Sequence, residues 1–434
     1  MYRNKIKELE AWKESPNRKP LVLNGARQVG KTWLLKEFGA KSYNSVAYIN
    51  LDHNDTVARL FELDYDVERI INGLELYTGT KITPGNTLII LDEIQECPAA
   101  LASLKYFCEN APEYHIAVAG SLLGIAIHSG SSYPVGKVTT MDLMPLTFSE
   151  FVRATGNPTL ADALDEADLK NLSPFHAKLI DILKHYLVVG GMPEVVQNYI
   201  DEGNVLQVRS IQQQIIRDYQ NDFSKHAPAN MAPKLLEIFN ILPDELAKEN
   251  KKFIFSMIRT GARAAEYENA LLWLEDSGIV RRIHRVKTTK TPLKVYSEKD
   301  AFKLYSLDVG LLGAQAELHP EVILEGDRLF IEFKGAMAEQ FVMQELIAVK
   351  FHPFYYKKDK PSREVDFLLD LGHIILPIEV KSGEKTYSKS LGEYIMANNI
   401  QRAIKLSYKE YREHGKGSVD YIPIYLAGKV ADLI

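Results

Sequence analysis

The sequence predicts an α/β protein whose N-terminal part is built on a parallel sheet covered by helices. Two observations lead to this fold class. Segments with a helical pattern, such as KTWLLKEF and PAALASLKYFCEN, lie between short apolar segments in the first 155 residues. These apolar segments are continuous, as in strands that are buried on both faces of a parallel sheet. Strands are therefore expected over 21–25, 45–51, 87–93, 115–121 and 137–146.

Length and composition limit the class of protein. The 434 residues exceed one ordinary domain, and 46% hydrophobic with 25% charged residues is typical of a globular protein. A net charge of −5 is mild, so contact with nucleic acid or acidic lipid requires a local patch. Cys97 and Cys108 cannot form a disulfide framework. The start, MYRNKIKELEAWKES, is not a signal peptide, and no apolar run reaches about 18 residues. We therefore expect a cytoplasmic protein without a membrane span.

A glycine-rich motif follows the first apolar segment. GARQVGKT, from Gly25 to Thr32, matches G-x-x-x-x-G-K-[ST]. Its glycines let backbone N–H groups point at phosphate oxygens, and the next helix adds its positive end. Lys31 is expected to reach the β- and γ-phosphates, and the Thr32 hydroxyl to ligate Mg²⁺. The strand before the motif and the helix after it argue against a chance turn. The expected nucleotide-binding residues are Gly25, Ala26, Arg27, Gln28, Val29, Gly30, Lys31, Thr32 and Trp33.

Two carboxylates end a later apolar strand, TLIILDEIQ. Asp92 is expected to hold Mg²⁺, directly or through water, and Glu93 to polarise the attacking water. A solvated strand end explains one acid equally well, but two successive acids fit hydrolysis better. The next strand ends in AGS, where Ser121 is expected to sense the γ-phosphate. A serine after a strand is also an ordinary turn residue.

Residues 20–155 resemble the ATPase domain of the AAA-type, archaeal-ATPase-like superfamily. The resemblance rests on NGARQVGKT, LIILDEIQ, AVAGS and YPVGKVTTMDLMPLTFSEF. It implies a five-stranded P-loop core that uses ATP and Mg²⁺. Members often carry arginine where this chain has Lys137, which puts a charge role there in doubt. Arg153, Arg209 and Arg217 are candidates for an arginine finger, and none of them is preferred.

The middle of the chain is helical and then basic. Residues 160–225 have a helical pattern interrupted by YLVVGGMPEVV, and the resemblance implies a small helical lid here. Residues 232–315 resemble a winged helix, with a recognition helix at 264–276 and a wing after 280. Residues 281–303 hold eight Lys or Arg against two acids, which suits phosphate contacts. The expected recognition helix carries acids that oppose DNA binding, so a packing role stays open; they are Glu266, Glu268, Glu275 and Asp276.

A second constellation lies in REVDFLLDLGHIILPIEVKSG. Adjacent strands would bring Asp366 beside Glu379 and Lys381, which share one face by period-2 alternation. Two carboxylates and a lysine can bind Mg²⁺ and position a water for phosphodiester hydrolysis. With Glu339 on an upstream helix, the pattern is similar to the restriction-endonuclease-like PD-(D/E)XK fold, although Val365 replaces the usual proline. The alternative is an inherited fold used for interaction, with the charges paired structurally.

Four parts are expected: a P-loop ATPase core over 1–155, a helical lid over 156–230, a winged helix over 231–320 and a nuclease-like domain over 321–434. The favoured function is an ATP-hydrolysing ATPase that acts on nucleic acid, with Glu93, Lys31, Asp366, Glu379 and Lys381 in catalysis. The alternative is an ATP-dependent switch or scaffold whose inactive nuclease-like domain binds a protein partner. ATP and Mg²⁺ are the expected cofactors. DNA, a protein partner and a homo-oligomer are left open.

Overall fold

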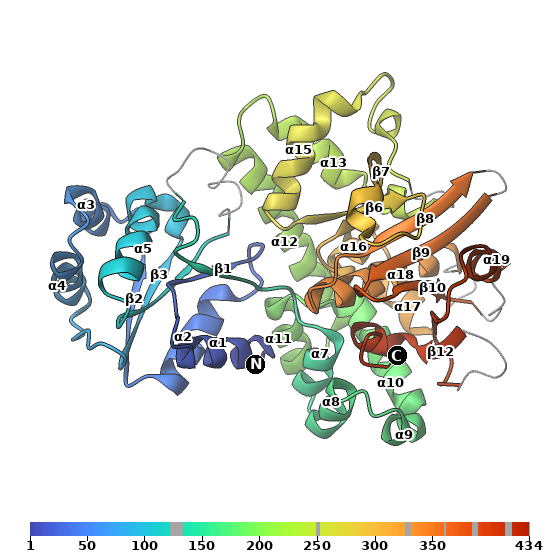
Figure 1. Ribbon diagram of the computed structural model, residues 1–434, viewed down its shortest axis with the longest axis horizontal. Coiled ribbons are helices and arrows are strands. Elements are labelled where there is room, and N and C mark those ends of the chain that lie inside the picture. Colours follow the sequence, from blue (N-terminus) through green and yellow to red (C-terminus); the bar gives the residue numbers. More distant parts are fainter. Residues whose placement is uncertain are drawn as a thin grey trace. The chain divides into compact units, whose positions relative to one another are not determined.

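The computed structural model describes residues 1–121, 133–248, 252–325, 331–359, 362–383, 389–412 and 419–433. The chain forms two compact units (Figure 1). The smaller consists chiefly of Tyr2–Met144, and the larger of Pro145–Glu275 and Ile279–Ile434. No helix within these described ranges is long and apolar enough to cross a membrane.

The smaller unit is built on a five-stranded parallel sheet with the order β2-β3-β4-β1-β5. All five expected strands are present, which confirms the predicted α/β class and its parallel core. The strands are β1 (Leu21–Asn24), β2 (Ser45–Asn50), β3 (Thr87–Asp92), β4 (His115–Ala119) and β5 (Thr139–Asp142). The helices are α1 (Lys5–Glu14), α2 (Lys31–Ser42), α3 (Asp55–Leu63), α4 (Val67–Thr78) and α5 (Pro98–Asn110).

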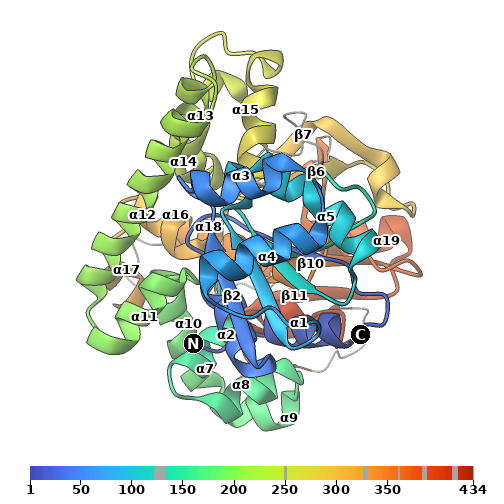
Figure 2. The same ribbon diagram turned by 90° about the vertical axis from the view of Figure 1, so that its left-hand side faces the viewer.

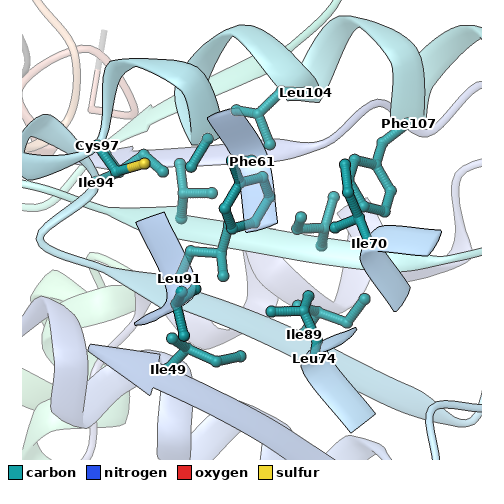
Figure 3. Close-up of a cluster of buried hydrophobic side chains, with 14 of the residues drawn as sticks. Ile49, Phe61, Ile70, Leu74, Ile89, Leu91, Ile94, Cys97, Leu104 and Phe107 are labelled. Atoms are coloured by element: carbon teal, nitrogen blue, oxygen red, sulfur yellow. The ribbon is translucent and has the colours of Figure 1, made fainter. Parts of the chain in front are cut away.

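Apolar side chains fix this sheet against α3, α4 and α5 (Figures 2 and 3). Ile89 and Leu91 of β3 meet Phe61 of α3, Leu74 of α4 and Leu104 of α5 in one buried cluster. Every residue of β3 and β4 is buried, as their continuous apolar sequences predict. Since the strands are parallel, the residues at their carboxyl ends collect at one edge of the sheet.

Helices make up the first part of the larger unit. They are α7 (Phe148–Ala154), α8 (Pro158–Asp165), α9 (Leu169–Leu172), α10 (His176–Val189), α11 (Pro193–Glu202), α12 (Val205–His226), α13 (Ala232–Asn240), α14 (Leu242–Ala247) and α15 (Ala264–Asp276). The last has the bounds that the sequence predicts for the recognition helix.

The predicted interruption at Gly190 and Gly191 separates α10 from α11. The carboxylate of Asp308 accepts hydrogen bonds from the backbone N–H groups of Gly191 (2.6 Å) and Leu311 (3.0 Å). A side chain at Gly190 would lie 2.1 Å from Asp308 Oδ1, and the φ of Gly190 is +74°. Gly190 therefore lets this buried carboxylate approach the backbone.

A seven-stranded mixed sheet completes the larger unit, with the order β12-β11-β10-β9-β8-β6-β7 (Figure 1). Its strands are β6 (Val280–Val286), β7 (Ser297–Ser306), β8 (Phe354–Asp359), β9 (Ser362–Asp370), β10 (Ile375–Lys381), β11 (Ala403–Ser407) and β12 (Val419–Pro423). The accompanying helices are α16 (Val309–Gln315), α17 (Pro320–Glu325), α18 (Ile331–Ala348) and α19 (Lys389–Asn398).

The expected wing belongs to this sheet. Strands β6 and β7 form an antiparallel hairpin, and β6 also pairs in parallel with β8, with Arg285 opposite Tyr355. The segments expected to form a winged helix and a nuclease-like domain therefore contribute strands to the same sheet. The expected boundary at residue 320 does not separate two sheets. The sequence does not reveal this, because β6 and β8 are far apart in the chain and their pairing has no local signature.

Candidate active site

The loop Gly25–Thr32 connects β1 to α2 at the carboxyl edge of the parallel sheet. Its glycines have backbone angles that favour glycine, with φ of +150° at Gly25 and +92° at Gly30. A side chain at Gly25 would meet the carbonyl oxygen of Leu143 at 2.4 Å. Helix α2 begins at Lys31 directly after the loop, so its first N–H groups are available to an anion there.

The Lys31 side chain folds back onto this loop. Its Nζ donates hydrogen bonds to the carbonyl oxygens of Gly25 and Ala26, both at 2.8 Å. Burial lowers the pKa of Lys31 to about 8, although the nearby carboxylates of Glu93 and Asp92 act in the opposite direction. A buried ammonium with carbonyl partners can exchange them for stronger phosphate acceptors.

Thr32 and Asp92 meet directly, although 60 positions separate them in the sequence. The Thr32 hydroxyl donates to Asp92 Oδ2 at 2.7 Å, and the Tyr48 hydroxyl donates to the same oxygen at 3.1 Å. Burial, followed by the charge of Asp92, raises the pKa of Tyr48 to about 12. Sequence reasoning missed Tyr48. It lies on β2, which pairs with β3, so a polar residue near the end of that strand was the available signal.

Glu93 follows Asp92 in a left-handed backbone conformation, with φ of 52° and ψ of 46°. Such a conformation is uncommon for a residue other than glycine and costs of order 1 kcal/mol. Gln95 Nε2 donates to Glu93 Oε2 at 2.6 Å and orients the carboxylate. Gln95 ends the segment LDEIQ, and its contact with Glu93 has no signature in the sequence.

The remaining expected contacts vary in strength. Ser121 is buried after β4, and its hydroxyl accepts a long hydrogen bond of 3.4 Å from Arg27 Nε. Trp33 is 42% exposed on α2. A residue that the sequence did not single out, Arg3, donates to the carbonyl oxygens of Val29 (3.1 Å) and Met144 (2.5 Å). It therefore ties the glycine-rich loop to the segment after β5.

The arginine-finger candidates have partners within the chain. Arg153 lies 2.6 Å from Asp162, and Arg209 donates to the carbonyl oxygens of Gly310 and Leu318. Arg217 is exposed on α12 and donates to Gln214. Lys137, at the position where arginine was expected, pairs with Glu109 at 2.8 Å.

Two arginines of the expected wing form ion pairs within the larger unit. Arg282 is 6% exposed and pairs with Glu268 at 2.9 Å and with Glu275. Arg285 pairs with Glu298. Glu268 and Glu275, two of the four acids on helix 264–276, thus act as partners of Arg282. Counting charges along the sequence overestimated the basic patch, because pairing between α15 and β6 is not visible there.

The four residues of the C-terminal constellation come together in the structure. Asp366 on β9 accepts a hydrogen bond from the N–H of Val380 at 2.8 Å, and Lys381 Nζ lies 2.6 Å from Glu379 Oε1. Burial, followed by the charges of Glu339 and Glu379, raises the pKa of Asp366 well above its usual range. The sequence therefore predicted this convergence correctly.

Sequence reasoning missed a further lysine in this cluster. Lys303 of β7 is 1% exposed, and its Nζ lies 2.7 Å from Glu364 Oε1 and 3.7 Å from Glu339 Oε2. Lys303 is the last of the eight Lys or Arg residues in the basic segment 281–303. The apolar context AFKLYS was the signal that this lysine faces the interior. In the parts of the chain that the structure describes, no three His, Cys, Asp or Glu side chains are grouped to hold a metal ion.

Three family models match the chain. Residues 17–152 match an AAA domain, whereas residues 180–322 and 334–426 match two domains of unknown function, DUF8612 and DUF4143. A comparison with curated proteins gives no match.

Solved structures with similarity include a Walker-type ATPase of Pyrococcus abyssi, with 15% identity, a TM-score of 0.45, and coverage of 72% of this chain and 95% of that one. The structure of Aeropyrum pernix ORC1 in complex with DNA has 16% identity and a TM-score of 0.28, and the match covers 73% of this chain and 93% of that one. Thermotoga maritima RuvB has 14% identity, a TM-score of 0.28, and coverage of 64% and 88%. The family match, together with the parallel sheet and the glycine-rich loop, identifies an AAA-type P-loop ATPase domain in residues 17–152.

Proposed function

We propose that the smaller unit hydrolyses ATP in a Mg²⁺-dependent reaction. The observation that carries this proposal is the contact of Thr32 with Asp92 beside Lys31 and Glu93. A hydroxyl and a carboxylate are hard oxygen donors, which fit Mg²⁺. When bound, this ion would supply charge stabilisation at the phosphates.

Each residue has a distinct role in this proposal. Lys31 leaves its two carbonyl partners and contacts the β- and γ-phosphates, while backbone N–H groups of the loop and α2 bind the remaining oxygens. Thr32 and Asp92 would hold Mg²⁺. Glu93 accepts a proton from the attacking water, and Gln95 keeps its carboxylate in position. Ser121, which follows β4, contacts the γ-phosphate in this proposal.

The test compares wild type with Glu93→Gln. The variant is expected to bind ATP but to hydrolyse it at least about 100-fold more slowly, which is the scale for losing a positioned base. Glu96→Gln is the matched control, because Glu96 lies in the same turn but is exposed. Steady-state phosphate release and binding of a fluorescent ATP analogue measure the two quantities. Equal turnover by wild type and Glu93→Gln would remove Glu93 from the mechanism.

We further propose that ATP turnover drives a switch whose larger unit binds a protein partner. The ion pairs of Arg282 and Arg285 support this over phosphate contacts, because they occupy two of the cations of the expected wing. Action on nucleic acid is the second candidate. The convergence of Asp366, Glu379 and Lys381 favours it, since that arrangement resembles a nuclease site.

ATP turnover with and without DNA distinguishes these candidates. Single- and double-stranded DNA are added at two salt concentrations. For the switch we expect turnover to be independent of DNA. Stimulation by DNA that weakens strongly with salt would support nucleic acid as the substrate, because phosphate contacts release counterions.

A further inference from the structure

The carboxylate cluster of the larger unit surrounds an ammonium group. Lys303 Nζ lies 2.7 Å from Glu364 Oε1 and 3.7 Å from Glu339 Oε2, and 5.0 Å from the centre of the Tyr355 ring. Tyr305 donates its hydroxyl hydrogen to the same Glu339 oxygen at 3.4 Å. The lysine therefore lies between a helix acid and a strand acid, with aromatic side chains around it.

Two more lysines pair with carboxylates of this cluster. Lys357 Nζ lies 2.8 Å from Glu364 Oε2, so Glu364 is held between two ammonium groups. Lys381 Nζ lies 2.6 Å from Glu379 Oε1. Asp366 accepts a backbone hydrogen bond from Val380. Each carboxylate is thus bound by groups of the chain itself.

A divalent cation does not fit this arrangement. Mg²⁺ needs about six oxygen ligands near 2.1 Å and usually retains several waters. Lys303 is 1% exposed and Glu379 is 4% exposed, so an ion that reached them would have to give up most of its bound water, which Mg²⁺ does reluctantly. A divalent ion beside Lys303 would also meet an unscreened positive charge in a buried environment.

We propose that Lys303 takes the place of a metal ion in this domain. The cluster is then a metal-free network of ion pairs, and the resemblance to a nuclease reflects the fold without metal-dependent cleavage. This inference does not rest on the proposed ATP hydrolysis, which uses residues of the other unit.

Binding of Mn²⁺ to the nucleotide-free protein is the first test. Calorimetric titration of wild type and Asp366→Asn is expected to give the same binding curve, because any weak binding lies elsewhere. A site in wild type that Asp366→Asn abolishes would overturn the proposal. Mg²⁺- or Mn²⁺-dependent cleavage of DNA that is lost in Asp366→Asn would overturn it as well.

Replacement of Lys303 is the second test. Lys303→Gln is expected to lower the melting temperature, because it leaves buried carboxylates without their counter-ion. If Lys303 takes the place of a metal ion, 1 mM Mn²⁺ should restore part of the lost melting temperature. Lys357→Gln is the matched control. It also contacts Glu364, but from the edge of the cluster, and we expect no recovery with Mn²⁺. A folded Lys303→Gln protein without a response to Mn²⁺ would overturn the proposal. If that variant does not fold, the wild-type titration decides.

Discussion

In the proposed ATP site, the titration of the buried Lys31 side chain makes ATP binding depend on pH. Its pKa is lowered from 10.5 to about 8 because burial disfavours the charged form. Below about pH 8 the side chain is charged and ready for phosphate, whereas above it the neutral amine predominates. Bound phosphates favour the charged form, so ATP binding above this pH takes up a proton.

We therefore expect the affinity for ATP to fall as pH rises through 8, by roughly tenfold at pH 9. Titration calorimetry in buffers of different ionisation enthalpy measures both the affinity and the proton uptake. Lys31→Arg is the control, because a guanidinium stays charged in this range. It should bind ATP more weakly but without the decline. A dissociation constant of wild type that does not change between pH 7 and 9 would contradict the assignment.

Glu345 on α18 is a second residue whose titration affects the molecule. Its carboxylate accepts a hydrogen bond of 2.9 Å from the N–H of Phe148. Burial raises the pKa of Glu345 to about 8, and the nearby Glu150 adds to the increase. In the unfolded chain the carboxyl ionises near pH 4.5, so between these values unfolding releases a proton.

The free energy of unfolding should consequently decrease as pH rises from about 4.5 to 8. Glu345→Gln keeps an acceptor for Phe148 but cannot ionise, and should be more stable than wild type by roughly 4 kcal/mol at pH 8. The difference should vanish near pH 4.5. Denaturant unfolding across this range measures it, with the exposed Glu202→Gln as control. The same difference at both ends of the range would contradict the assignment.

Which site residues the sequence could predict depends on how far apart they lie in the chain. Lys31 and Thr32 belong to one continuous motif, and Asp92 and Glu93 end one strand, so local patterns reveal them. Their partners come from other elements. Tyr48 reaches Asp92 from β2, and Lys303 reaches Glu364 from β7. Such contacts depend on strand order, which local composition does not encode.

The same distinction holds for helices and strands. The five strands of the smaller unit and helix α15 follow from periodicity and flanking glycines. The parallel pairing of β6 with β8 does not follow from such patterns, because β7 and the helices α16 to α18 lie between these two strands in the chain. The break between α10 and α11 was predicted, but its reason was not. The reason is the close approach of the Asp308 carboxylate to the backbone at Gly190 and Gly191, and Asp308 is more than a hundred residues away in the chain.

That break allows a sharp comparison of two glycines. Both Gly190 and Gly203 have positive φ, but a side chain at Gly190 would meet Asp308 at 2.1 Å, whereas at Gly203 nothing lies within 4 Å. We expect Gly203→Ala to cost about 1 kcal/mol of unfolding free energy from backbone strain. Gly190→Ala should cost roughly 3 kcal/mol or more, since it also displaces a buried, hydrogen-bonded carboxylate. Denaturant unfolding measures both, and equal losses would contradict the role of Asp308.

At the scale of the whole molecule, the ATPase motifs and the ion-pair cluster belong to different compact units. Gly25, Asp92 and Glu93 lie within Tyr2–Met144, whereas Lys303 and Asp366 lie within Ile279–Ile434. The resemblance in sequence extends to residue 155. The smaller unit ends earlier, because Phe148 and its neighbours bind Glu345 and Gly191 of the larger unit. The stretch of sequence that resembles an ATPase domain is therefore longer than the compact unit that carries the ATPase motifs.

Two units with separate cores should unfold in two thermal transitions. In the proposed function ATP binds the smaller unit together with Mg²⁺. It should therefore raise the midpoint of that transition, by a stabilisation of about 2.7 kcal/mol when ATP is at 100 times its dissociation constant. Scanning calorimetry measures both midpoints. Lys31→Ala should abolish the shift, because the phosphates lose their buried cation, while Asp366→Asn should leave the shift intact and change the other midpoint. If wild type instead shows a single transition whose midpoint ATP raises, the two units unfold cooperatively, and Asp366→Asn should then change that same midpoint.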